Sequence, residues 1–320
     1  MNSAILKARF RELDWLFLFL SSWVLPFVID YLYPLTYFWS LAFWFVPTLI
    51  LLPRFLEYTD PKGRRRSALF VTTVGIVVLG ILLDCVFGHA ILRFDETPTA
   101  SYVWWVKIPS LGVKVPIEEF LFYTMAPITI LLVYAWADEY WLALYSARKE
   151  RDAIQPSDRA VEISPLTIAL AVVTLAVGVL VFRRNPEATL WLPPYFTFLV
   201  AFALIPPVVL FRRMRRHVNW PAFGVTAMYV FMTSLIWEAT LALPRGWWWY
   251  RPDAMLGLSV AAWTPQKDRP FPLEAILVWL ACPFICILLY EYVKFRKYRA
   301  RAKATWVHPS LRPSESVELI

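Results

Sequence analysis

Apolar stretches alternate with short polar segments along the whole chain. The longest of these stretches fall at 14–33, 36–56, 67–92, 116–137, 163–182, 190–211, 222–243 and 272–293. An α-helix rises about 1.5 Å per residue, so about 20 apolar residues are needed to cross ~30 Å of hydrocarbon. The pattern therefore predicts an all-α, polytopic membrane protein with about eight transmembrane helices.

The composition agrees with this prediction. The 320 residues are 59% hydrophobic and only 18% charged, and the mean hydropathy is +0.53. The core of a soluble protein cannot bury so much apolar surface. The first apolar stretch has spanning length and is not followed by a small-residue cleavage site, so we expect it to be a helix and not a signal peptide.

Basic residues give the chain a net charge of +8, and their positions indicate its orientation. With the N-terminus in the cytoplasm, 23 of the 32 lysines and arginines lie on the cytoplasmic side and 9 on the other. Positive residues are enriched in the cytoplasmic loops of membrane proteins. We therefore predict a bacterial cytoplasmic membrane protein with both termini in the cytoplasm. Nucleic acid is not an expected partner, because this charge pattern is a topology signal.

One short segment occurs twice. Residues 116–127 read Pro-Ile-Glu-Glu-Phe-Leu-Phe-Tyr-Thr-Met-Ala-Pro, and residues 272–283 read Pro-Leu-Glu-Ala-Ile-Leu-Val-Trp-Leu-Ala-Cys-Pro. At a constant offset of 156, the matched pairs are Pro116 and Pro272, Glu118 and Glu274, Leu121 and Leu277, Pro127 and Pro283, and Tyr134 and Tyr290. Because each half has an even number of predicted spans, the halves share one orientation and form two parallel four-helix repeats.

This repeat predicts how the chain is divided. A first four-helix repeat covers 1–137, a cytoplasmic linker 138–162, a second repeat 163–293 and a basic cytoplasmic tail 294–320. The second and sixth spans also correspond, because each opens with a Tyr-Phe pair, at Tyr37 and at Tyr195.

Five carboxyl groups are predicted to gather near the outer face of the membrane. Asp84 and Glu238 lie near the outer ends of the third and seventh spans, and Glu118, Glu119 and Glu274 begin the fourth and eighth. An ionisable side chain inside a membrane is costly, which favours a functional role. Three structural alternatives stay open. Glu118 and Glu274 could stabilise a helix start, and Glu119 could be exposed at the membrane interface. Asp84 and Glu238 could only join helices.

Aromatic residues accompany these carboxyl groups. The candidates for contact with a substrate are Trp104, Trp105, Phe122, Tyr123, Trp247, Trp248, Trp249, Tyr250 and Trp279. An aromatic ring face stabilises a nearby cation by about 0.5–2 kcal/mol. The tryptophans could instead form an aromatic belt at the membrane interface.

Metal and nucleotide chemistry is not expected from this sequence. Cys85, Cys282 and Cys286 all lie within apolar stretches, and the three histidines are scattered along the chain. No Cys/His spacing is typical of a metal site, and the 9 glycines form no phosphate-binding or dinucleotide motif. We therefore expect neither a metal nor a cofactor.

Carboxyl groups alone can support acid–base chemistry. Hydrocarbon disfavours their charged form, so one buried carboxyl group can be a neutral proton donor while a second acts as the base. Such a pair suits the proton-initiated rearrangement of a polyene. The helix dipole instead favours Glu118 as an anion. Glu118 is therefore either the acid, or the base to a proton carried by Asp84 or Glu238.

The segment Pro-Ile-Glu-Glu-Phe-Leu-Phe-Tyr, followed by Ala-Pro and preceded by a tryptophan-bearing loop, resembles the lycopene cyclase domain. This domain occurs in small membrane lycopene cyclases, as heterodimers or fused repeats. Its Pro-x-Glu-Glu-x-x-Phe pattern is matched by Pro116, Glu118, Glu119, Phe120 and Phe122, and in part by Pro272 and Glu274. The resemblance covers roughly 35–137 and 190–293.

The resemblance implies a non-flavin lycopene cyclase that forms ionone-type end rings without net redox change. Its partners would be a hydrophobic polyene and membrane lipid, with homo-oligomers or association with other carotenoid enzymes left open. The expected steps are protonation at C2 of an acyclic end, attack of the C5–C6 double bond on the C1 cation, and loss of a proton from C6.

Glu118 is the first choice for proton transfer, with Glu119 as its partner and the other three carboxyl groups completing a polar cluster. Because Ala275 stands where the second copy would match Glu119, we expect one catalytic pocket, in or beside the first half. Two alternatives stay open: a carotenoid or terpenoid hydratase, in which water quenches the cation, and a non-enzymatic pseudosymmetric lipid carrier.

Overall fold

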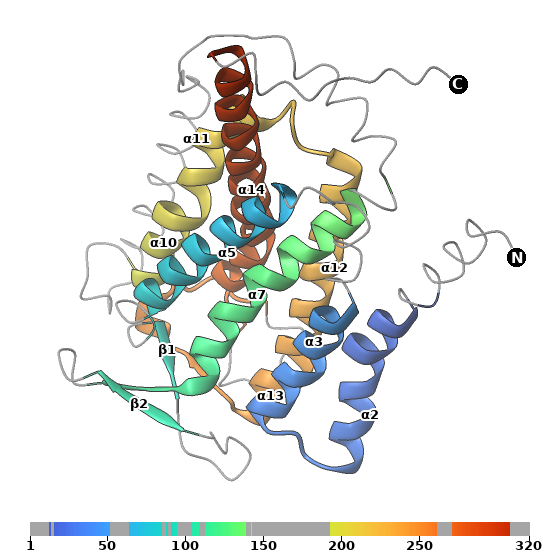
Figure 1. The fold of residues 1–320 in the computed structure, drawn as a ribbon. Coiled ribbons are helices and arrows are strands. Elements are labelled where there is room, and N and C mark those ends of the chain that lie inside the picture. The colour runs from blue at the N-terminus through green and yellow to red at the C-terminus, as the bar shows by residue number, and fades with distance from the viewer. Residues whose placement is uncertain are drawn as a thin grey trace, which may run out of the picture.

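The structure of the chain is a computed structural model. It describes residues 16–51, 64–84, 91–94, 104–108, 113–138, 193–260 and 271–307, together with Leu13, Gly88 and Leu142. Most of these residues are helical, as the apolar pattern predicts. Two pairs of short strands, which the expectation of helices alone did not include, lie at one end of the bundle (Figure 1).

The first half of the chain contributes a compact group of helices. These are the π-helical turn η1 (Leu20–Val24) and the helices α2 (Leu25–Leu32), α3 (Tyr37–Leu51), α5 (Arg64–Leu83) and α7 (Ile117–Trp136). They lie within the first four predicted spans. α7 packs against both α3 and α5, so it forms the centre of this half.

The second half contributes α10 (Pro194–Phe198), η4 (Leu199–Leu204), α11 (Ile205–Met214), α12 (Trp220–Trp237), η5 (Glu238–Ala242), α13 (Leu243–Arg245) and α14 (Leu273–Val307). These elements lie in the sixth, seventh and eighth predicted spans. α14 packs against α11 and α12, and also against α5 and α7 of the first half (Figure 1). The fifth predicted span, 163–182, lies outside the described residues, and so does the linker except for Asp138 and Leu142. Eight spans in two parallel repeats therefore stay a prediction.

The π-helical turns η1, η4 and η5 are each followed by a proline. The prolines are Pro26 after η1, Pro206 after η4 and Pro244 after η5. Proline has no N–H to donate, and its ring clashes with the carbonyl four residues earlier in an α-helix. The wider turn removes that clash. The turn η5 matters most for the site, because its first residue is Glu238.

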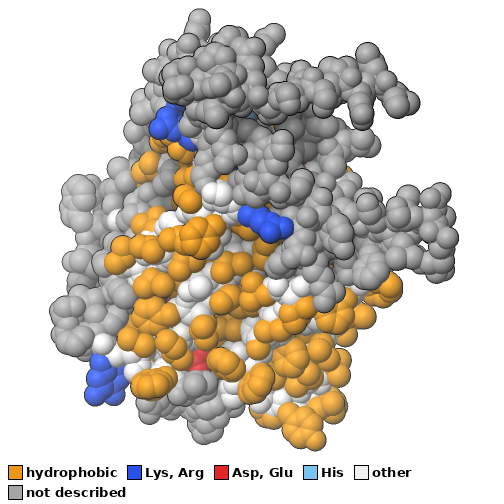
Figure 2. Space-filling view, in the orientation of Figure 1, with side chains coloured by type: hydrophobic (Ala, Val, Ile, Leu, Met, Phe, Trp, Pro, Cys, Tyr) orange, Lys and Arg blue, Asp and Glu red, His pale blue; other side chains and the backbone are white. Residues whose placement is uncertain are grey.

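Within the part of the chain that the structure describes, three helices are long and apolar enough to cross a membrane: Ile117–Trp136, Trp220–Arg245 and Leu273–Arg296. Shorter apolar helices occupy Leu16–Leu32, Tyr37–Ile50 and Arg66–Leu82. Large apolar side chains are exposed on the outer helices, including Trp39 on α3 and Phe70 on α5. Figure 2 shows one face of the molecule covered by hydrophobic side chains. A patch of that extent suits lipid and not water, which supports association with a membrane.

One of the two strand pairs ties both halves together at one end of the bundle. β1 (Leu92–Arg93) pairs with β4 (Trp249–Tyr250), and β2 (Trp105–Ile108) pairs with β3 (Val113–Pro116), both antiparallel. β1 follows the third predicted span and β4 follows the seventh. β3 ends at Pro116 and leads directly into α7. The first turn of α7 is therefore fixed against the strands.

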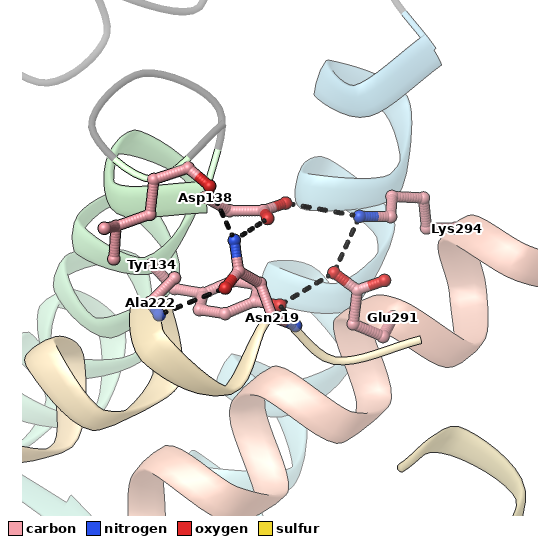
Figure 3. Close-up of polar contacts among 7 residues, drawn as sticks. Tyr134, Asp138, Asn219, Ala222, Glu291 and Lys294 are labelled. Atoms are coloured by element: carbon pink, nitrogen blue, oxygen red, sulfur yellow. Dashed lines mark hydrogen bonds and ion pairs between the residues drawn. The ribbon is translucent and has the colours of Figure 1, made fainter. Parts of the chain in front are cut away.

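Asn219 fixes the start of α12 to the other end of α7. Its side-chain oxygen accepts the backbone N–H of Ala222, and its Nδ2 donates to Asp138 at 2.8 Å and to the carbonyl of Leu142 at 3.2 Å (Figure 3). Asn219 and Asp138 are both buried. Asparagine is a favoured helix N-cap, so one side chain both starts α12 and joins it to the first half.

α14 joins the same buried group of polar side chains, which we call the α7–α14 network. Tyr134 donates to Glu291 at 3.0 Å, while Lys294 pairs with Glu291 at 2.6 Å and with Asp138 at 3.6 Å (Figure 3). Asp138 and Lys294 stand at the repeat offset of 156, as do Tyr134 and Tyr290, whose rings lie 6.1 Å apart. Residues at equivalent positions thus meet across the two halves.

Candidate functional site

A cavity of about 180 Å³ lies near the strand-bearing end of the bundle. Residues of both halves line it, from α3, α5 and α7 on one side and from α10, α12 and α14 on the other. The lining is mostly apolar and aromatic, and its carboxyl groups are Glu119 and Glu238. The cavity therefore combines an oily, aromatic wall with two acidic side chains.

Glu119 enters the cavity wall from the first turn of α7. Its carboxyl group is buried and accepts a hydrogen bond of 2.6 Å from the hydroxyl of Tyr37. Tyr37, the first residue of α3, is itself buried and stacks on Trp247, with ring centroids 5.8 Å apart. Trp248 packs against the same ring. The donor to Glu119 is thus held in place by aromatic packing.

Glu238 enters the wall from η5. It accepts a hydrogen bond of 2.8 Å from the indole N–H of Trp279 on α14, and a second from the hydroxyl of Tyr250 on β4. Burial, and then the neighbouring carboxylate, raise the pKa of Tyr250 well above its ordinary value. Tyr250 therefore remains a protonated hydrogen-bond donor. Tyr195 stacks on it, with ring centroids 5.8 Å apart.

Asp84 lies just after α5 and is also buried. A Cβ atom at Gly88 would lie 2.3 Å from its Oδ1, so Asp84 has room only because Gly88, which lines the cavity, has no side chain. Neither carboxyl oxygen has a hydrogen-bond partner among the residues that the structure describes. The charges of Asp84 and Glu119 are close enough to repel each other.

Glu118 and Glu274, the repeated carboxyl groups, are buried but do not line the cavity. Glu274 accepts the backbone N–H of Leu256, in the loop before α14. This contact joins that loop to the start of α14. The sequence favours Glu118 for proton transfer, but it is the next residue, Glu119, that faces the cavity.

The predicted aromatic residues separate into two groups. Phe122, Tyr123, Trp248, Tyr250 and Trp279 line the cavity, as expected of residues that contact a substrate there. The others lie outside its wall: Trp104 is 73% exposed, Trp105 and Trp249 are half-buried in β2 and β4, and Trp247 is fully buried under Tyr37.

Four aromatic residues of the cavity wall are absent from the sequence-based candidates: Tyr37, Tyr195, Phe198 and Trp237. A signal for two of them was present, because Tyr37 and Tyr195 open corresponding spans. Trp237 directly precedes Glu238, so the start of the π-helical turn η5 places both side chains in the cavity wall. Cys282 and Cys286 also reach the wall from α14. Among the described residues, no group of three His, Cys, Asp or Glu side chains could hold a metal ion.

This arrangement can give a proton to an apolar molecule and take one back. Both carboxyl groups lie where water is largely replaced by aromatic rings, so a proton leaving either of them has few competing acceptors. Phe122 stacks on Trp237 at 6.1 Å and meets Trp279 edge-to-face at 5.5 Å. Rings at such distances can stabilise a cation formed between them.

Comparisons with protein-family models, with curated proteins and with solved structures found no match to this chain. The resemblance to membrane lycopene cyclases therefore rests on the motif residues, and the function must be argued from the cavity.

Proposed function

We propose that this protein is an integral-membrane carotenoid cyclase that forms ionone-type rings at the acyclic ends of lycopene or a related polyene. The observation that carries the proposal is the cavity, whose aromatic, mostly apolar wall includes the carboxyl groups of Glu119 and Glu238. A polyene has no polar group to bind, so its site needs apolar surface and a few groups that act on its double bonds.

The chemistry needs one proton donor and one proton acceptor. Protonation at C2 uses the C1–C2 double bond and leaves a cation at C1. The C5–C6 double bond then attacks C1, which forms the C1–C6 bond and moves the cation to C5. Loss of the proton at C6 gives the ring double bond. One proton is gained and one is lost, so two carboxyl groups are sufficient and no redox partner is required.

Aromatic side chains would stabilise the intermediate cations. Phe122, Trp237 and Trp279 pack together in the wall, and each exposed ring face can contribute about 0.5–2 kcal/mol to a cation beside it. At about 1.4 kcal/mol per factor of ten, two or three such faces could accelerate cation formation roughly 5- to 20,000-fold. This supports a reaction through a carbocation and not simple storage of a lipid.

The proposal is tested by expressing the gene in a bacterium that accumulates lycopene and separating the extracted pigments by chromatography. We expect cyclic carotenes from the wild-type protein and from Asp253→Asn, a matched control at an exposed carboxyl group. The double variant Glu119→Gln with Glu238→Gln should leave lycopene unchanged. A tertiary alcohol from the wild type would identify a hydratase instead. Unaltered lycopene with well-expressed wild-type protein would favour the carrier.

A further inference from the structure

The cavity is too small to hold a whole carotene. Its volume is about 180 Å³. An apolar protein cavity of about 150 Å³ holds one benzene molecule. The space therefore fits one six-membered ring with a few methyl groups, which is the size of one end of the polyene. An extended carotene is about as long as the hydrocarbon of a bilayer is thick, ~30 Å, so most of the chain has to lie outside the cavity.

The wall of the cavity reaches the surface of the molecule beside α5. Among the described residues that line the cavity, Leu79 is the only exposed one, at 40%. Its neighbours Ile76 and Gly80 are half-buried and line the cavity too. The exposed side chains of α5 next to Leu79, which are Val78 and Leu82, are apolar. The opening beside Leu79 therefore suits an apolar molecule that arrives from lipid.

This opening lies close to the acidic end of the cavity. A Cβ atom at Gly80 would lie 3.1 Å from Cδ1 of Tyr123, so this part of α5 packs directly against the Tyr123 ring. Tyr123 follows Glu119 by one helical turn on α7, which is about 6 Å along the helix axis. Further along α7 and α14 the cavity is lined by Ile130 and Cys286, which are both buried. A chain that enters at the opening therefore reaches Glu119 with its first few carbons.

On the basis of the proposed cyclase function, we propose that the cavity takes one end of the polyene at a time, through the opening beside Leu79. The remaining chain stays outside, along the apolar surface of α5. One ring forms for each entry. Since the other end of the same molecule is then outside, a second ring requires the one-ring product to leave and to enter again by its acyclic end. The substrate class is therefore a polyene with an acyclic isoprenoid end, whatever its other end carries.

The order of the products tests the proposal that one end reacts at a time. Purified full-length protein in phosphatidylcholine vesicles is supplied with a large excess of lycopene, and the pigments are separated at successive times. We expect the one-ring product to exceed the amount of protein several-fold before any two-ring product forms. A two-ring product from the start, with the one-ring product always below the amount of protein, shows that both ends react in one visit and overturns the proposal.

The position of the opening is tested with two bulky replacements on α5. Leu79→Trp places an indole at the opening, and its matched control is Val78→Trp, at an exposed position that does not line the cavity. Gly80→Leu fills the close contact between α5 and Tyr123. Its control is Gly75→Leu, because a Cβ atom at Gly75 meets nothing within 4 Å.

Binding is measured apart from the reaction by the visible circular dichroism of lycopene. Lycopene is achiral, and it gives a signal when a protein site holds it in one twisted conformation. We expect Leu79→Trp and Gly80→Leu to need about tenfold more lycopene or higher for half of the signal, since overpacking typically costs that much, and both controls to titrate as the wild type does. An unchanged titration in either variant contradicts entry beside α5. If Gly80→Leu does not accumulate, Leu79→Trp decides alone.

Failure of this inference is distinguishable from failure of the cyclase function. If the wild type forms no ring, the proposed cyclase function fails, while the dichroism titration still decides whether a polyene enters beside α5. If rings form but both appear in one visit, or the variants on α5 bind lycopene as the wild type does, the cyclase function stands and this inference fails.

Discussion

Replacing Tyr37 by phenylalanine removes the hydrogen bond to Glu119 and very little else. The Tyr37 side chain is 1% exposed, and its ring packs on Trp247 and Trp248. Phenylalanine keeps that ring and loses only the hydroxyl group, which donates to Glu119 at 2.6 Å. The substitution therefore tests one interaction inside an otherwise unchanged wall.

The expected effect depends on the strength of that bond. When Glu119 gives up a proton, negative charge develops on its carboxyl group, and the Tyr37 hydroxyl stabilises that charge. A hydrogen bond to a charged group contributes about 1.5–3 kcal/mol. Its loss should slow the proton-transfer step roughly 10- to 150-fold, at about 1.4 kcal/mol per factor of ten.

The assay is a single-turnover measurement, with protein in lipid vesicles in excess over lycopene, so that chemistry and not product release is observed. Tyr31→Phe is the matched control, because Tyr31 is 88% exposed and should tolerate the change. Thermal unfolding of both variants verifies that the fold is retained. A Tyr37→Phe rate within about twofold of wild type would refute the role of this hydrogen bond in the acid.

Three further predictions concern other parts of the structure. Lys294→Met leaves two buried carboxyl groups of the α7–α14 network without their cation, so the free energy of unfolding should fall by about 3–5 kcal/mol. Unfolding is measured in detergent, and the control is Lys107→Met at an exposed lysine. An unchanged unfolding midpoint would show that the network does not hold the halves together. Tyr250→Phe removes one donor from Glu238, so the buried carboxylate is less stable and is ionised less often; ring formation should slow roughly 10-fold or more in the single-turnover assay. An unaffected rate argues against proton transfer by Glu238. Ala126→Trp places an indole in the cavity and should abolish ring formation although the protein still accumulates, and continued ring formation would place the substrate elsewhere.

Much of the helical architecture could be predicted from the sequence. The apolar stretches predicted α3, α5, α7, α12 and α14, because a helix that crosses or lines a membrane has to be apolar over about 20 residues. The strands were not predictable in this way. β1 and β4 are two residues long, which is too short for an alternating pattern, and their pairing depends on contacts between distant loops.

The sequence also predicted which carboxyl groups approach one end of the bundle, but not which of two neighbours faces the cavity. Successive residues on a helix point about 100° apart. α7 is apolar around its whole circumference, so no hydrophilic face distinguishes Glu118 from Glu119. The two tryptophans in the loop after α13 present the same difficulty. Trp247 is buried under Tyr37, whereas Trp248 lines the cavity. This difference depends on the conformation of the loop, which the spacing of residues does not determine.

The central claim is that carboxyl groups of this protein give a proton to the polyene and remove another. The mass of the product formed in heavy water tests it most directly. Purified protein in lipid vesicles is supplied with lycopene in D₂O, after its exchangeable carboxyl protons have been replaced by deuterium. Each ring formed should add one deuterium, and Glu119→Gln should form no ring. A cyclic product without deuterium would contradict it.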